Sequence, residues 1–145
     1  MSEVEKYNLS DREKASLIEA EILKYPQLDP VLKHHFSPGI YARELHIPAG
    51  AILTGRIHKY TNLNILSAGE MDVLTEDGMQ RVKAPFTVVS PPGTKRVAYA
   101  HTDCVWTTIL ATDETDPDAI EAHFTAGSET EFLEFVEKQK LIGRN

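Results

Sequence analysis

The stretch GAILTGRIHKYTNLNILSAG, residues 50–69, has the pattern of two short strands with a site between them. A glycine stands at each end, and Arg56, His58 and Asn62 lie between the two glycines. Five residues separate the first glycine from Arg56, one separates Arg56 from His58, three separate His58 from Asn62, and six precede the second glycine. Because alternate side chains of a strand share a face, Thr54, Arg56 and His58 are expected on one surface. This surface is the first candidate for a functional site.

The surrounding region, residues 40–112, is predicted to consist of strands. The segment IYARELHI alternates, so that Tyr41 and Arg43 share one face with Leu45 and Ile47. A tight hairpin is indicated by Asp77-Gly78, and a further break by Pro-Pro-Gly at 91–93. Short strands with turns at intervals of about eight to twelve residues are typical of a β-sandwich or a small barrel.

Residues 1–39 are predicted to form a helix and a connector. Ser10 and Glu13 have the spacing of a capping box, and Leu17, Ile18 and Ile22 recur at helical intervals and predict an apolar face. Prolines and a glycine predict that 27–39 is an irregular connector. Its adjacent histidines, at 34 and 35, point to opposite sides of an extended chain, so they are not expected to bind one metal ion.

Residues 113–145 are predicted to return to helix. Asp116 is a plausible N-cap with Pro117 at the first helical position, and Ser128 and Glu131 have the spacing of a second capping box. Gly143 follows the end of this second helix.

Composition favours one acidic, soluble domain of 145 residues. Fifteen Lys and Arg face 22 Asp and Glu, for a formal charge of −7, which disfavours nonspecific binding to nucleic acid or anionic membranes. The single cysteine, Cys104, cannot form an internal disulfide and is expected to be buried in a strand. The charged amino terminus does not resemble a signal peptide, so a cytoplasmic location is expected.

The middle region resembles the cupin superfamily, whose members form a double-stranded β-helix, or jelly-roll, barrel. The first cupin motif is G, five residues, H-x-H, three or four residues, E, six residues, G, and every gap is kept here between Gly50 and Gly69. The second motif is kept in part: Pro91 and Gly93 match, whereas Pro85, Arg96 and Ala100 replace its first glycine, its histidine and its asparagine. The resemblance implies one cupin domain, with a barrel at 40–112, an amino-terminal helix and carboxy-terminal helices. The layout is also similar to that of small cupin-like proteins of phage genomes.

The same resemblance implies which positions would hold a metal ion. They are Arg56, His58, Asn62 and Arg96, of which only His58 is a normal ligand. Arginine is cationic and offers no lone pair, and amides favour hard ions beside carboxylates. We therefore expect no conventional metal site and no cofactor. The alternative is a divalent metal at His58 with unconventional ligands such as His46, His101 or Tyr60.

In the cupin frame, these side chains instead predict a positive cavity. Arg56, His58, Asn62 and Arg96 would converge inside the barrel, with Tyr41 and Arg43 as neighbours. Guanidinium groups bind carboxylates and phosphates through paired, charge-assisted hydrogen bonds. A small anionic metabolite, such as a sugar acid, a nucleotide sugar or a nucleotide, is the expected ligand.

Two interpretations without a ligand compete with this prediction. Glu44, Glu70 or Asp72 could neutralise the arginines inside the core, or the strand register could turn Arg56 and Arg96 toward solvent. Trp106 is expected in the core, with stacking on a planar ligand as its alternative.

Three other functions remain open from the sequence. The first is a metal-independent isomerase or epimerase, with His58 as base and Tyr60, Tyr41 or Tyr99 as acid. The second is an atypical metal-dependent cupin. The third is a phage-related interaction or assembly protein, and a homodimer formed through the barrel or the helices is expected in any case.

Overall fold

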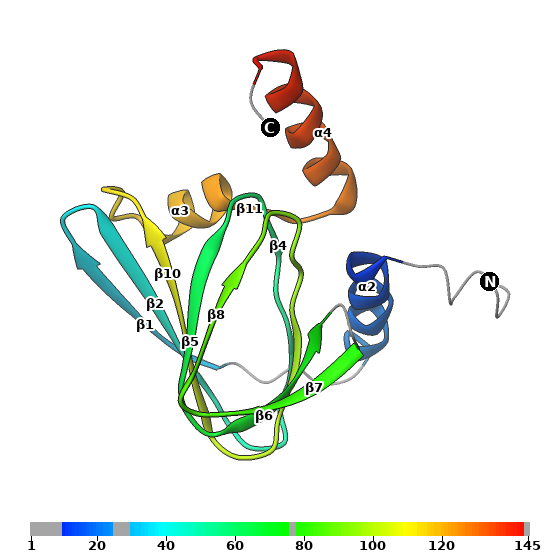
Figure 1. Ribbon diagram of the computed structural model, residues 1–145, viewed down its shortest axis with the longest axis vertical. Helices are drawn as coiled ribbons and strands as arrows, with labels where there is room; N and C mark the ends of the chain where they lie inside the picture. The colour runs from blue at the N-terminus through cyan, green and yellow to red at the C-terminus, as the bar shows by residue number, and fades with distance from the viewer. Residues whose placement is uncertain (1–9, 25–29, 76–77, 144–145) are drawn as a thin grey trace, which may run out of the picture.

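The computed structural model describes residues 10–24, 30–75 and 78–143 and shows a mainly β molecule with helices toward both ends of the chain (Figure 1). In chain order, its elements are α2 (Asp11–Ile22), β1 (Val31–Ser37), β2 (Ile40–Ile47), β3 (Ile52–Thr54), β4 (Ile57–His58), β5 (Asn62–Ala68), β6 (Glu70–Thr75), β7 (Gly78–Lys83), β8 (Phe86–Ser90), β9 (Val97–Ala100), β10 (Cys104–Ala111), α3 (Pro117–Phe124), β11 (Thr125–Ala126) and α4 (Glu129–Leu141). No helix among these elements is both long and apolar enough to cross a membrane.

The strands form two facing antiparallel sheets, as expected for a jelly-roll barrel (Figure 1). The larger sheet has the order β1-β2-β10-β5-β8, and the smaller has the order β3-β9-β6-β7. A short pairing of β4 with β11 joins the barrel wall to the chain between α3 and α4. The main hydrophobic core lies between the sheets and contains Ile47 and Leu66 from the larger sheet and Met71 and Val73 from the smaller one. Burial of this apolar surface is the main force that holds the two sheets together.

Strand β2 shows the alternation predicted from the sequence. Tyr41 pairs with Leu110 of β10, Arg43 with Thr108, and Leu45 with Trp106. These side chains line the interior, whereas Glu44 contacts histidines on the outer face. The strand register therefore places a charged residue, Arg43, inside the barrel.

The two glycines that frame residues 50–69 both have backbone angles that favour glycine. Gly50 has φ +87° and Gly69 has φ +91°, in the left-handed region. At Gly69 a Cβ atom would lie 2.3 Å from the Asp103 carbonyl oxygen and 2.6 Å from the Cys104 sulfur. At Gly50 no atom lies within 4 Å of a Cβ position. Gly69 is therefore required both by its backbone conformation and by the close approach of the start of β10.

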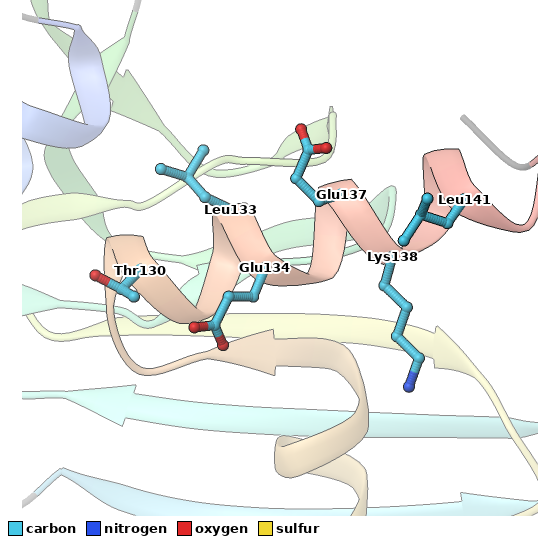
Figure 2. A pocket seen from close by; sticks show the side chains of 6 residues that line it. All are labelled: Thr130, Leu133, Glu134, Glu137, Lys138 and Leu141. Atoms are coloured by element: carbon cyan, nitrogen blue, oxygen red, sulfur yellow. The ribbon is translucent and has the colours of Figure 1, made fainter.

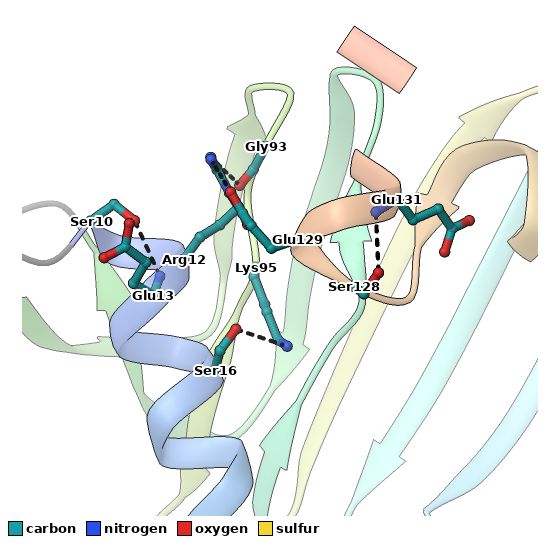
Figure 3. A network of polar contacts seen from close by, with 9 residues as sticks. All are labelled: Ser10, Arg12, Glu13, Ser16, Gly93, Lys95, Ser128, Glu129 and Glu131. Carbon is teal, nitrogen blue, oxygen red and sulfur yellow. Dashed lines mark hydrogen bonds and ion pairs between the residues drawn. The ribbon is translucent and has the colours of Figure 1, made fainter. Parts of the chain in front are cut away.

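Side-chain caps start the helices where the sequence predicts. The Ser10 hydroxyl accepts from the Glu13 amide at 3.2 Å, and the Ser128 hydroxyl accepts from the Glu131 amide at 3.1 Å (Figure 3). Asp116 caps α3, with Pro117 at its first turn. The predicted helix starts are thus confirmed.

Helix α2 is held to the barrel by polar contacts more than by its predicted apolar face. Leu17 and Ile18 are 47% and 36% exposed, so that prediction is wrong for these two residues. The short side chain of Ala15 instead packs against Leu74 and Val97 of the smaller sheet. Arg12 donates two hydrogen bonds of 2.9 Å to Glu129 at the start of α4 (Figure 3). The sequence pattern identified the helix but not its contacts.

The predicted connector at 27–39 is wrong for 31–37, which form strand β1; residues 27–29 lie outside the described residues. Strand β1 pairs with β2 from Val31↔His46 to Ser37↔Ile40. Gly39 has φ +77°, so it turns the chain between the two strands. The prolines that suggested irregular structure lie just outside the strand, where they do not interrupt its ladder.

Candidate functional site

A cavity of about 520 Å³ lies inside the barrel. Its lining comes from both sheets, from β4 and from α3. This volume falls within the range of roughly 300–1,000 Å³ that is usual for small-molecule sites. The cavity is therefore large enough to hold a metabolite.

Five of the sequence-predicted residues line this cavity: Tyr41, Arg43, Arg56, His58 and Arg96. Thr54 lines it as well, so the shared face predicted for the stretch 54–58 is present. The larger-sheet register and the β4 pairing bring these side chains together from positions up to 55 residues apart in the chain.

Asn62 and Tyr60 are not among the lining residues, so their predicted placement in the site needs correction. Asn62 is buried on the same face of β5 as the cavity residue Asn64, and its side-chain oxygen accepts from Asn64 at 2.7 Å. Tyr60 stacks on His123 at a centroid distance of 5.4 Å and contacts Phe124 and Phe135 edge-on. Tyr60 thus packs among aromatic residues of α3 and α4 rather than lining the cavity.

Arg96 is held by a network of buried polar side chains. Its Nη2 donates to the Ser90 hydroxyl at 2.7 Å, and Ser90 also accepts from Asn64 at 2.9 Å. Asn64 in turn accepts from the Thr108 hydroxyl at 2.7 Å. Burial lowers the pKa of the Arg96 guanidinium. Within the described part of the chain, its buried Nε has no hydrogen-bond partner.

His58 lies beside two cations. Its backbone amide donates to the Thr94 carbonyl at 2.9 Å, and its carbonyl accepts from Gly93 at 2.7 Å, which fixes the strand at this point. Burial, together with repulsion from Arg96 and Arg43, lowers the pKa of His58 to about 4. The imidazole is therefore neutral at neutral pH, and the positive field around it comes from the two arginines.

Arg43 is the least compensated cation of the site. Its side chain forms no hydrogen bond or ion pair with any residue in 10–24, 30–75 or 78–143. Tyr41, two residues away on the same face, instead bonds to His34 Nδ1 at 2.6 Å. Burial raises the pKa of Tyr41. The Arg43 guanidinium thus keeps all its donors available to the cavity.

Arg56 is compensated, by an acid that the sequence did not indicate. Its Nε lies 3.2 Å from Glu121 on α3 and donates to the Thr125 hydroxyl at 2.8 Å. Its side chain is 42% exposed, so it lies where α3 meets the barrel rather than deep inside. Arg56 is partly turned toward solvent, whereas Arg96 is not.

The acids considered from the sequence lie elsewhere. Glu44 bonds to His35 and to His46 on the outer face of the sheet. Glu70 pairs with Arg81 at 2.8 Å, and Asp72 lies 3.0 Å from His101. None of the three acids neutralises a cavity arginine within the described residues.

The donor set does not fit a metal ion. The positions that correspond to cupin ligands carry two guanidiniums, one imidazole and one amide, and the oxygen of this amide accepts a hydrogen bond from Asn64. Guanidinium groups repel a divalent cation and have no lone pair to donate. Among the described residues, no group of three or more His, Cys, Asp or Glu side chains is arranged to hold a metal ion. His46 and His101, considered as unconventional ligands, do not line the cavity.

Sequence reasoning missed three buried polar partners of the site, Ser90, Asn64 and Thr108, and one exposed acid, Glu121. Thr108 lies on a strand whose other inward positions are apolar, and Asn64 shares the inward face of β5 with Asn62 and Leu66. A polar residue at an inward position is a signal of a buried polar partner, but it can be read only once the strand register is known. Glu121 had no such signal, because its approach to Arg56 depends on how α3 packs.

A second, open hollow lies on the outer side of α4 (Figure 2). It is lined by Thr130, Leu133, Glu134, Glu137, Lys138 and Leu141. Leu133 and Leu141 are 49% and 86% exposed, and the hollow has no buried polar group. It lacks the features of a small-molecule site.

Comparison with known proteins identifies the fold. No protein-family model matches the sequence, and no curated protein matches it either. Among solved structures, KdgF from Halomonas sp. is 16% identical, with a TM-score of 0.51, over 68% of this chain and 95% of that one. A protein with a double-stranded β-helix domain from Klebsiella pneumoniae is 13% identical, with a TM-score of 0.51, over 63% of this chain and 85% of that one. A cupin superfamily protein from Desulfitobacterium hafniense is 14% identical, with a TM-score of 0.50, over 68% of this chain and 87% of that one. The chain has the double-stranded β-helix fold of cupins.

Proposed function

We propose that this protein binds a small organic anion in the barrel cavity, without a conventional metal centre. The observation that carries the proposal is the pair Arg43 and Arg96. Arg43 has no partner among the described residues, and Arg96 has a buried Nε without one. A desolvated cation is costly unless an anion compensates it, so a carboxylate or phosphate would be stabilised between these groups. Their planar donor forks match such an anion.

Binding is favoured over proton transfer at this site. A general base works best when its pKa lies near the working pH, and His58 has a pKa of about 4 in the free protein. Tyr60, the first acid considered, packs against the helices instead. His58 is therefore assigned as a neutral hydrogen-bonding group beside the anion.

The proposal is tested by isothermal titration of the protein with a panel of small carboxylates and phosphates. We expect at least one anion to bind, and Arg43→Gln and Arg96→Gln each to weaken binding by tenfold or more. Arg81→Gln is the matched control, because Arg81 is paired with Glu70 on an exposed strand outside the cavity. Equal affinity in all four proteins, or no binding of any anion at millimolar concentration, would rule the proposal out.

A further inference from the structure

The barrel cavity is divided into a polar half and an apolar half by the register of its strands. One cross-strand row of the larger sheet joins Arg43, Thr108 and Asn64. The next row toward the other end of β2 joins Leu45, Trp106 and Leu66. Because inward side chains repeat every second residue, the row of donors lies directly beside a row of apolar groups.

The smaller sheet continues the apolar half. Leu53, Met71 and Val73 line the cavity, and all three belong to or pack against the main hydrophobic core. Leu45, Leu53 and Trp106 are only partly buried, so apolar surface remains facing the cavity. A ligand hydroxyl placed there would lose its bonds to water without replacement, whereas a hydrocarbon group would gain from burial.

We infer that the ligand is an amphipathic anion: one carboxylate or phosphate group held by Arg43 and Arg96, joined to an aromatic or aliphatic body that lies against Leu45, Met71 and Trp106. This inference rests on the proposed function and narrows it, because it disfavours the polyhydroxylated sugar acids and nucleotide sugars that the sequence allowed. Trp106 forms part of the wall on which the body packs.

Three probes separate the two halves of the cavity. Phenylacetate carries a carboxylate on an apolar body, gluconate carries a carboxylate on a hydroxylated body, and phenylethanol carries the apolar body without charge. Trp106 is the only tryptophan of the chain and lines the apolar half of the cavity, so its fluorescence reports on ligand bound there. We expect phenylacetate to bind at least tenfold more tightly than either other probe and to change the Trp106 emission.

Two variants locate the contacts. Leu45→Asn is expected to lower the affinity for phenylacetate at least fivefold and to leave the affinity for gluconate within twofold of its original value. Arg43→Gln is expected to lower the affinity for both carboxylates. Leu133→Asn, on the exposed face of α4, is the control and leaves both affinities unchanged. The comparison of the three probes on the unmodified protein stands even if Leu45→Asn does not fold.

Failure of the amphipathic ligand class and failure of the anion site itself would give different results. Gluconate binding as tightly as phenylacetate, or phenylacetate binding without a change in Trp106 emission, would overturn the amphipathic ligand and leave the anion site standing. No binding of phenylacetate, gluconate or inorganic phosphate would overturn both the ligand class and the proposed function.

Discussion

Replacement of Arg43 is expected to weaken anion binding and, at the same time, to stabilise the ligand-free protein. Arg43 lines the cavity without a hydrogen bond or ion pair to any described residue, so its replacement removes an uncompensated charge from the ligand-free protein. We expect Arg43→Gln to raise the free energy of unfolding by about 0.5–1 kcal/mol, since a binding site is often stabilised when an uncompensated functional group is removed. Urea unfolding of the ligand-free protein measures this change. A destabilised Arg43→Gln variant would mean that Arg43 has a structural role.

The lowered pKa of His58 predicts a loss of stability in mild acid. Its ordinary pKa is 6.5 and its folded pKa is about 4, so between these values the unfolded chain takes up a proton that the folded chain does not. The contribution of His58 to the free energy of unfolding is fully present above pH 6.5, and it is lost as the pH falls toward 4. The loss amounts to about 3 kcal/mol, at about 1.4 kcal/mol per pH unit.

The variant His58→Gln isolates this contribution. Carboxylates also titrate near the lower end of the range, so the informative quantity is the difference in unfolding free energy between the two proteins at each pH. We expect the difference to shrink by most of the predicted loss between pH 6.5 and 4. Parallel stability curves would show that His58 is not desolvated beside cations.

At the scale of single residues, the sequence predicted which cations enter the barrel but not how they are supported. The alternation of β2 was enough to place Tyr41 and Arg43, and the cupin spacing was enough to place His58 and Arg96. Asn62 was misplaced because the motif gives its position in the chain and not its hydrogen-bond partner: Asn62 bonds to Asn64, and Asn64 lines the cavity instead.

Among the structural elements, the two glycines of the stretch 50–69 offer a matched pair of substitutions. Both have positive φ, but only Gly69 has backbone and sulfur atoms within reach of a Cβ. We expect Gly50→Ala to cost about 1 kcal/mol from the backbone conformation alone. Gly69→Ala should cost about 3 kcal/mol or more, because the clash forces β10 to move. Thermal or urea unfolding measures both, and equal losses would contradict the close packing of Gly69 on Asp103.

Helix α3 supplies an internal competitor for the anion. Glu121 pairs with Arg56 at 3.2 Å and lines the cavity. Glu121→Gln removes a negative charge from the site, so we expect phenylacetate to bind two- to tenfold more tightly. Glu134→Gln, which removes the same charge from the outer side of α4, serves as control. Unchanged affinity in Glu121→Gln would mean that this acid does not act on the cavity.

The elements themselves were largely predictable. The caps at Ser10, Asp116 and Ser128 set the helix starts, and turn residues set most strand ends. Strand β1 was missed because its neighbours Pro30, Pro38 and Gly39 resemble a loop, and its partner β2 lies next to it only after the chain has turned. Pairing between strands is a tertiary property that local patterns do not contain.

For the whole molecule, the cupin fold was predicted from the spacing of two motifs and from the pattern of short strands, and it is confirmed by the sheet topology and the structural neighbours. The chemical class of the proposed ligand was less predictable, because it depends on two rows of side chains, one polar and one apolar, that the strand register places side by side. The expected homodimer stays a prediction that light scattering tests. Exposed apolar side chains on β1 and α4, such as Phe36 and Leu141, supply surface for it.

We propose above that an anion binds between Arg43, Arg96 and His58. The most direct test is the pKa of the His58 ring, followed by NMR with and without saturating benzenesulfonate, which stays anionic throughout the titration; His58→Gln assigns the signal. We expect a pKa of about 4 for His58 in the free protein and a rise of at least one pH unit when the anion neutralises the arginines. A ring that titrates near 6.5 in the free protein, or one whose pKa does not respond to the bound anion, would contradict it.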